Sequence, residues 1–374
     1  MLALLLQHYA HGGSLANLVS YISLRMAGAG LTALLMAFLI GPAIIARLRA
    51  HKIGQIVRTE GPSTHLGKRG TPTMGGLVIL IATIVPTLLW ARLDNRFVLV
   101  ALLAFTWMGA IGFVDDYLKI VQRRPRGLVA RYKLAGQIVF GLTLSYVLIR
   151  FPWEGTVLPA TSTTVPFFKY VYVTMRWWLY AGFVTFVVTA SSNAVNLTDG
   201  LDGLATGLAA IAAITFAVFA YVFGRTDTSQ YLLVFYLPGA GELAIFCTAL
   251  MGACIGFLWF NAHPASVFMG DTGSLAIGGA LGTVAILLKA EFLLALVGGV
   301  FVAETISVLI QTGMFMVRLR RHGREYAQRH RVFRMAPLHH HFEQLGWHES
   351  TVVTRFYILG LLCALVALST LKIR

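Results

Sequence analysis

Ten apolar stretches dominate the chain, and each is long enough to cross the hydrocarbon core of a bilayer, which is about 30 Å thick. The backbone finds no water to bond in that core, so segments of this kind fold as helices. Only 12% of the 374 residues are charged, against about 25% in soluble domains. We therefore predict an all-α polytopic membrane protein with one integral membrane domain over residues 1–374. The predicted spans are residues 24–46, 74–91, 97–114, 133–150, 177–195, 201–223, 241–260, 273–288, 292–317 and 352–371.

The positions of lysine and arginine along the chain predict how the protein is oriented in the membrane. Three predicted loops, 47–73, 115–133 and 318–351, together with Arg355 hold 20 of the 30 basic residues. Basic loops mark the cytoplasmic side, so both termini are expected in the periplasm. The net charge of +15 fits attraction to anionic lipids and substrates, and no nucleic-acid partner is expected.

Two further segments are predicted to stay outside the bilayer core. Residues 151–176 are rich in proline, threonine and aromatic residues, which is typical of an interfacial hairpin or a short amphipathic element. Residues 231–238 are apolar but too short to span, so we expect them at the interface.

Five aspartates lie at the ends of predicted spans, and all five fall on the predicted cytoplasmic side. They are a third of the 15 acidic residues in the chain. Carboxylates at membrane depth are costly and mark functional sites by default. Oxygen ligands beside basic loops predict divalent-metal phosphate chemistry at a membrane face. The five are Asp115, Asp116, Asp199, Asp202 and Asp271.

The first acidic string is GFVDDYLK, residues 112–119. Adjacent residues of a helix point about 100° apart, so Asp115 and Asp116 cannot address one ligand in the same way. We expect one to face the site and the other to hold Lys119, which lies one turn on. The alternative is a helix end with an ordinary interfacial ion pair.

The second string is SNAVNLTDGLDG, residues 192–203. Asn193, Asn196 and Asp199 recur every three residues and therefore share a helix face. Asp202 and two glycines follow, and glycines allow a backbone to approach a ligand closely. A tight polar turn between two spans is the alternative.

The third string is WFNAHPASVFMGDTGS, residues 259–274. Asp271 lies between two glycines at the start of a predicted span, where a carboxylate can bind a ligand or simply cap the helix. Asn261 lies ten residues earlier. Phe268 can stack on a nucleobase or merely pack against its neighbours.

The fourth string is MAPLHHHFEQLGW, residues 335–347, which follows a strongly basic run. Its three histidines, His339, His340 and His341, are consecutive, so their side chains splay apart. No cysteine or HExxH pattern accompanies them, and zinc binding is the weaker interpretation. Phosphate contact or proton handling near neutral pH fits better.

The fifth string, KRGTPTMGG at residues 68–76, lies just before the second span. Lys68 and Thr73 offer cationic and hydroxyl contacts, and the paired glycines allow close helix packing. Taken alone, this string is a weak signal.

Glu304 lies within the ninth predicted span, with Ser307 and Gln311 on roughly the same helix face. An intramembrane carboxylate is a functional candidate by default. The equal alternative is a protonated glutamate that ties the bundle together.

Together these strings resemble the bacterial phospho-N-acetylmuramoyl-pentapeptide transferases, within the polyprenyl-phosphate N-acetylhexosamine-1-phosphate transferase superfamily. The Asp-rich strings are typical of the superfamily, and APLHHHFE, residues 336–343, is typical of the muramoyl-pentapeptide branch. The resemblance runs from residue 68 to the end. One departure is the stretch 320–330, which is longer and more basic than the family pattern.

The resemblance implies the reaction of UDP-N-acetylmuramoyl-pentapeptide with undecaprenyl phosphate. The products are lipid I and UMP, the cofactor is Mg²⁺, and the reaction is the first membrane step of peptidoglycan synthesis. A ten-span homodimer among the lipids of the bacterial cytoplasmic (inner) membrane is also implied.

The resemblance further implies roles for single residues. Asp271 would bind Mg²⁺, and Asp115 would take the proton of the lipid phosphate before attack on the β-phosphorus. Asp116 would orient the pair or assist the metal. The residues expected to hold phosphates are Lys119, His339 and His340. The expected uridine contacts are Lys68, Gly200, Leu201, Asp202 and Phe268. The adjoining polar pocket is expected to comprise Thr73, Asn193, Asn196, Asp199 and Asn261, with Gln311 and His341 as further substrate-binding residues.

Other readings of the sequence stay open. A sister transferase that moves N-acetylglucosamine-1-phosphate to the same lipid shares the aspartate strings, and the histidine string argues against it. A two-step mechanism would make an aspartate the nucleophile. A secondary transporter would place carboxylates at the bilayer midplane between repeats, and a structural scaffold would need no Asn and Asp clusters between spans.

Overall fold

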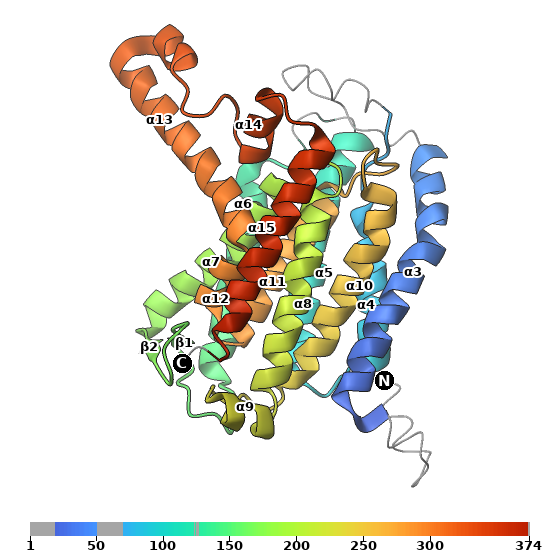
Figure 1. Ribbon diagram of the computed structural model, residues 1–374, viewed down its shortest axis with the longest axis vertical. Helices are drawn as coiled ribbons and strands as arrows, with labels where there is room; N and C mark the ends of the chain where they lie inside the picture. Colours follow the sequence, from blue (N-terminus) through green and yellow to red (C-terminus); the bar gives the residue numbers. More distant parts are fainter. Residues whose placement is uncertain (1–18, 51–69, 123, 125–126, 373–374) are drawn as a thin grey trace.

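The computed structural model describes residues 19–50, 70–122, 124 and 127–372. This part of the chain is mostly helical, as predicted, and adds one small antiparallel hairpin to an otherwise all-α fold (Figure 1). The α-helices are α3 (Ile22–Ala50), α4 (Gly76–Trp90), α5 (Arg96–Ile120), α6 (Ala130–Arg150), α7 (Trp177–Thr198), α8 (Leu204–Phe223), α9 (Thr226–Leu232), α10 (Leu243–Asn261), α11 (Gly270–Leu287), α12 (Glu291–Val297), α13 (Gly299–Arg329), α14 (Leu338–Gln344) and α15 (Glu349–Ser369). The 3-10 turn η2 (Ala240–Glu242) and the strands β1 (Ser162–Thr164) and β2 (Tyr172–Thr174) complete the elements.

Nine helices in the described part of the chain are long and apolar enough to cross a membrane. The second predicted span, 74–91, corresponds to α4, which has 15 residues and is about 22 Å long at 1.5 Å per residue. It still runs between the two ends of the bundle, because Gly75 before it donates to the Phe268 carbonyl and Trp90 at its end accepts from Arg25. The fold is that of a multi-pass membrane protein, and the count of ten crossings stays a prediction that depends on α4.

The long helices lie side by side and alternate in direction (Figure 1). The last turns of α5, α7 and α10 and the first turns of α8, α11 and α15 lie at one end, which we call the site end. The first turn of α3 and the last turn of α15 lie at the opposite end (Figure 1). This arrangement agrees with an even number of crossings. Which end faces the cytoplasm stays a prediction.

Close backbone approach fixes α11 against α4 and α5. A Cβ added to Gly112 of α5 would lie 2.1 Å from the Asp271 carbonyl oxygen, and one on Gly76 of α4 would lie 2.2 Å from the Gly273 nitrogen. Only glycine fits at such contacts. The first turn of α11 is therefore held directly beside the last two turns of α5.

The predicted ninth span, 292–317, is wrong as a single segment. The chain instead forms the short helix α12, breaks at Gly298, and continues as α13 for 31 residues. The predicted loops 115–133 and 318–351 also begin within helices, because α5 continues to Ile120 and α13 to Arg329. Much of the basic run after residue 317 is thus helical, with a kink at Gly323, and it projects beyond the neighbouring helices (Figure 1).

The predicted hairpin within residues 151–176 is confirmed. β1 and β2 pair antiparallel, with Thr163 opposite Val173. At its base the Thr163 hydroxyl donates to Glu291 at 2.5 Å, and the Lys289 ammonium donates to the Ala160 carbonyl at 2.5 Å. The hairpin is therefore tied to the connection between α11 and α12, at the end opposite the site.

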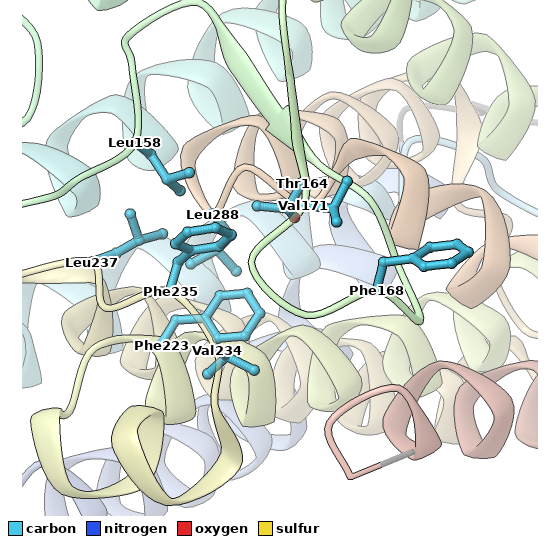
Figure 2. Close-up of a pocket in the computed structure, with 9 residues that line it drawn as sticks. All are labelled: Leu158, Thr164, Phe168, Val171, Phe223, Val234, Phe235, Leu237 and Leu288. Carbon is cyan, nitrogen blue, oxygen red and sulfur yellow. The ribbon is translucent and has the colours of Figure 1, made fainter. Parts of the chain in front are cut away.

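A small apolar pocket lies beneath this hairpin (Figure 2). Figure 2 shows Val171 and Thr164 of the hairpin on one side and Phe223 and Phe235 on the other, while the ring of Phe168 points outward. Its nine labelled lining residues include no acid, base or histidine. Phe235 belongs to the predicted interfacial segment 231–238, of which α9 takes in only the first two residues. The pocket is a packing feature and carries no chemistry.

Candidate active site

Three of the five predicted aspartates meet at the site end. One oxygen from each of Asp115, Asp116 and Asp271 lies within 4.8 Å of the others. The last turns of α5 supply the first two and the first turn of α11 supplies the third. Asp115 and Asp116 are 1% and 3% exposed, whereas the Asp271 side chain is 16% exposed. Asp271 is therefore the member of the cluster most open to a ligand.

Two lysines lie between these carboxylates. Lys119 pairs with Asp115 one helical turn earlier, and its Nζ lies 3.0 Å from Asp271 Oδ2. Lys133, near the start of α6, places its Nζ 2.6 Å from Asp271 Oδ2 and 3.4 Å from Asp115 Oδ2. The predicted pairing of Lys119 with one aspartate is confirmed for Asp115. Lys133 was not predicted as a site residue, because in the sequence it is only one of several basic residues in the segment 115–133.

Asp116 has a different set of contacts and faces the N-terminus of α11. Its Oδ2 accepts the Thr272 backbone N–H at 2.9 Å and the Thr272 hydroxyl at 2.6 Å, and its Oδ1 accepts the Asp271 N–H at 3.3 Å. The first N–H groups of a helix have no partner within it, and a carboxylate there also meets the positive end of the helix dipole. Asp116 thus fixes the backbone that carries Asp271.

The two asparagines of α7 form hydrogen bonds with different partners. Asn196 Nδ2 donates to Asp271 Oδ1 at 2.8 Å and lies 2.8 Å from the Ser274 hydroxyl. Asn193, one turn earlier, donates instead to Gln137 Oε1 at 2.9 Å and to the Thr189 carbonyl at 2.8 Å. Asn196 therefore orients Asp271, whereas Asn193 joins α7 to α6.

Asp199 ends α7 as its C-cap residue. Burial, together with the nearby charges of Asp271, Asp116 and Asp202, raises the pKa of Asp199 to about 8. A group of this kind is protonated at neutral pH as long as no cation is close. Carboxylates whose pKa is strongly shifted by burial and by nearby charges are typical of functional sites.

His339 joins the fourth string to the second. It is fully buried, and a Cβ added to Gly200 would lie 2.2 Å from its Nε2. Glu304 Oε1 accepts the His339 N–H at 3.2 Å and lies 3.2 Å from its Nδ1. Glu304 thus ties α13 to α14 and holds the histidine string against the turn after α7, which favours the structural alternative for this glutamate.

The next two histidines have separate surroundings, as expected from their spacing. His340 Nδ1 lies 2.7 Å from Glu343 Oε2, and His341 Nδ1 accepts the Arg334 N–H at 3.2 Å. Gln311 uses its amide on the backbone of Phe333, both at the N–H and at the carbonyl.

The remaining predicted site residues that the structure describes lie around the same end. Thr73 is buried, 3.0 Å from where a Cβ on Gly270 would lie. Phe268 is partly exposed, and its backbone bonds Pro72 and Gly75. The amide of Asn261 is used within the protein, and its partners are Gly203, Thr206 and Val267. Leu201 and Asp202 are buried in the turn before α8, and Lys68 lies outside the described residues.

The donor set of the aspartate cluster fits a magnesium ion. Carboxylate oxygens are the ligands that Mg²⁺ prefers, and one oxygen from each of the three aspartates lies within 4.8 Å of the others. Asp271 would be the principal ligand, because it is the most exposed of the three.

The fold and this site define a class: a helical membrane protein with a carboxylate–lysine site for phosphate chemistry at one end of its bundle. Residues 98–289 match the model for Glycosyl transferase family 4, and residues 68–80 match the Phospho-N-acetylmuramoyl-pentapeptide-transferase signature 1. The chain belongs to the phospho-N-acetylmuramoyl-pentapeptide-transferase family.

Similar curated proteins support this assignment. The chain is 62% identical over 382 residues to the phospho-N-acetylmuramoyl-pentapeptide-transferase of Gemmatimonas aurantiaca, with all of both chains covered. It is 50% identical to that of Koribacter versatilis, over 95% of this chain and 94% of the other. The Geobacter sp. (strain M21) protein is 48% identical over the full length of both. The resemblance inferred from the motifs is confirmed.

Proposed function

We propose that the chain transfers phospho-N-acetylmuramoyl-pentapeptide from its UDP-activated form to undecaprenyl phosphate, giving lipid I and UMP. The observation that carries the proposal is the group of Asp115, Asp116 and Asp271 with two lysines at one end of a membrane bundle. Family membership supplies the identity of the sugar and the lipid. The reaction would take place at the cytoplasmic face of the bacterial inner membrane.

Phosphoryl transfer depends on positioning and charge neutralisation more than on covalent help from the protein. When bound at Asp271, Mg²⁺ would neutralise negative charge on the pyrophosphate of the nucleotide substrate. Asn196 holds Asp271 Oδ1 from one side, and Asp116 holds the backbone beneath it. These two contacts would keep the carboxylate aimed at the pyrophosphate.

Asp115 would accept the proton of the lipid phosphate. Its Oδ1 accepts the Leu128 N–H at 2.8 Å, which leaves Oδ2, on the lysine side, as the atom that takes the proton. The freed phosphate oxygen forms a bond to the β-phosphorus, the bond from that phosphorus to the bridging oxygen breaks, and UMP leaves. Lys119 and Lys133 would exchange their carboxylate partners for phosphate oxygens during this step.

The remaining roles follow the family pattern. His339 and His340 would lie beside the phosphates, with Glu304 holding His339 in position. The proposed uridine contacts are Lys68, Gly200, Leu201, Asp202 and Phe268. The proposed polar pocket comprises Thr73, Asn193, Asn196, Asp199 and Asn261, with Gln311 and His341 nearby. We also propose a homodimer, which sedimentation in a density-matched detergent would test.

The test is UMP release from purified protein supplied with UDP-N-acetylmuramoyl-pentapeptide and undecaprenyl phosphate. We expect release with Mg²⁺, none with EDTA, and none from a folded Asp271→Asn variant. Asp227→Asn is the matched control, because Asp227 is an exposed aspartate paired with Arg225 away from the site. Full activity of Asp271→Asn, or activity in EDTA, would overturn the proposed metal site.

The same assay separates the alternatives. With undecaprenyl phosphate present, release of UMP from UDP-N-acetylglucosamine but not from UDP-N-acetylmuramoyl-pentapeptide would identify the sister transferase instead. In the two-step mechanism an aspartate would bond to the β-phosphorus and UMP would leave, so the enzyme would carry the phospho-N-acetylmuramoyl-pentapeptide group. Detection of this adduct without lipid would favour that mechanism, and its absence in a rapid burst experiment would exclude it.

A further inference from the structure

Gln137 of α6 is a buried polar residue to which the proposed reaction assigns no role. It is 1% exposed, and its side chain bonds two neighbouring residues of α7. Its Nε2 donates to the Ser192 hydroxyl at 3.2 Å, and its Oε1 accepts from Asn193 Nδ2 at 2.9 Å. The Ser192 hydroxyl in turn donates to the Leu275 carbonyl of α11 at 3.2 Å. Gln137 and Ser192 therefore link three helices, α6, α7 and α11, in the interior of the bundle.

This link lies one helical turn from the site on each of the three helices. Residues four positions apart lie on the same face of a helix, and each residue of the link has such a neighbour in the site. The pairs are Gln137 and Lys133 on α6, Ser192 and Asn196 on α7, and Leu275 and Asp271 on α11. The site residues of these pairs meet at the Asp271 carboxylate, which accepts from Lys133 at 2.6 Å and from Asn196 at 2.8 Å. The link is thus a second polar layer behind the site.

Backbone contact already fixes two of the three helices against each other. A Cβ added to Gly278 of α11 would lie 2.4 Å from the Ser191 carbonyl oxygen of α7, and one on Gly282 would lie 2.2 Å from Ser191 Oγ. Only glycine fits at such contacts, so α7 and α11 hold Asn196 against Asp271 without help from α6. The third helix, α6, packs mainly against α7. Its place relative to α11 therefore depends on how it is held on α7.

The rotation of α6 on α7 depends on Gln137. Gly141 lets α6 approach α7 closely, since a Cβ there would lie 2.6 Å from Thr185 Cα. Such a contact sets the distance between two helices but specifies their rotation only weakly. A hydrogen bond needs a donor and an acceptor that are both close and aligned, so the two bonds of Gln137 specify the rotation and the height of α6. The same rotation decides whether Lys133, one turn away, reaches Asp271.

We propose that Gln137 is a positioning residue of the transferase site, which acts by fixing the α6 backbone that carries Lys133. A lysine ammonium ends a flexible stem of four carbons, so its place depends on the backbone from which it extends. Gln137 holds that backbone where the ammonium, now 2.6 Å from Asp271 Oδ2, can pass to phosphate oxygens during transfer. This inference rests on the proposed reaction. Because Asn196 is held on α11 separately, the magnesium requirement does not depend on Gln137.

Substitution of Gln137 by methionine tests this role. Methionine is also unbranched and fills a similar space, and Gln137→Met leaves the bonds of Ser192 to Leu275 and of Asn193 to Thr189 in place. At saturating Mg²⁺ we expect kcat for UMP release to fall about 10–100-fold, because a misplacement of about 1 Å can cost roughly 100-fold. KM for the nucleotide should stay nearly unchanged, as for a contact made only in the transition state.

Ser192→Ala breaks the same link from α7 and should show the same loss of kcat with KM unchanged. It decides the question if Gln137→Met does not fold. The matched control is Thr32→Val, which removes a hydrogen bond between helices far from the site, where Trp90 Nε1 donates to Thr32 at 3.1 Å. With every variant assayed well below its melting temperature, Thr32→Val should keep the wild-type kcat.

An unchanged kcat in folded Gln137→Met, or an equal loss in Thr32→Val, overturns the positioning role while leaving the reaction intact. A wild-type chain that releases no UMP refutes the proposed reaction itself, and this inference with it. The two failures are therefore distinguishable.

A double substitution shows whether Gln137 acts through Lys133. Lys133→Arg keeps a cation but changes its shape and reach. We expect Gln137→Met to lower kcat by a smaller factor in this background than in the wild type, because the fit that it disturbs is already altered. The same factor in both backgrounds means that Gln137 acts elsewhere and overturns the proposal.

Discussion

Asp116 accepts two hydrogen bonds from Thr272, one from the backbone N–H at 2.9 Å and one from the hydroxyl at 2.6 Å. The carboxylate of Asp116 therefore binds the N-terminus of α11. Asp115 and Asp116 contact different groups, because a helix turns about 100° between adjacent residues. One faces the lysines and the other faces the backbone that presents Asp271.

This contact predicts different stabilities for two substitutions of Asp116. Asp116→Ala leaves two donors of Thr272 without a partner in a buried place and is expected to cost about 2 kcal/mol. Asp116→Asn keeps an oxygen acceptor and removes the repulsion with Asp271, so its stability should stay near that of the wild type. Thermal unfolding in metal-free detergent measures both. Equal losses from the two variants would contradict the capping role.

The contact between Asn196 and Asp271 predicts a change in the magnesium requirement. Asn196→Ala removes the hydrogen bond to Asp271 Oδ1, and loss of a contact that orients a metal ligand typically lowers affinity 10–100-fold. We expect the Mg²⁺ concentration for half-maximal UMP release to rise by about that factor. Asn193→Ala is the control, since Asn193 bonds Gln137 instead. A similar shift in both variants would show that the effect is not specific to Asp271.

Asp199 predicts a pH dependence of stability. Its pKa is raised from 3.8 to about 8, so between these values the folded chain holds a proton that the unfolded chain has lost. The stabilisation is therefore complete below about pH 4 and is lost as the pH rises toward 8. Melting temperatures of Asp199→Asn should fall less than those of the wild type across this window, in EDTA. Parallel curves for the two proteins would exclude a protonated Asp199.

The basic end of α13 predicts a salt effect on substrate binding. Arg320, Arg321 and Arg324 are exposed, and each basic residue near a surface contributes about 1 kcal/mol of attraction to anionic lipid at low salt. High salt should raise the apparent KM before it lowers turnover. Replacing all three by Gln should raise KM several-fold at low salt and weaken its salt dependence. Arg225→Gln, away from the site, should change neither, and unchanged salt slopes in the triple variant would refute the role.

The helical fold and the end at which the aspartates lie could be predicted from the sequence alone. The apolar stretches had to become helices because the bilayer leaves no other partner for their backbone. The aspartates could be assigned to one end, because spans of known length alternate in direction and basic residues mark one side. For the same reason Asp115, Asp116 and Asp271 were expected together, and the structure brings them within reach of a single ion.

The contacts between helices required the folded structure. These contacts depend on how helices far apart in the sequence are rotated and shifted against one another. Examples are Lys133 beside Asp271, Asp116 bonded to Thr272, and Glu304 bonded to His339. A periodic pattern specifies which face of a helix is apolar, but it holds no record of which residue of a neighbour lies opposite. That register is set by close packing, such as the backbone contact at Gly112, and so the division of labour among the aspartates emerges only in three dimensions.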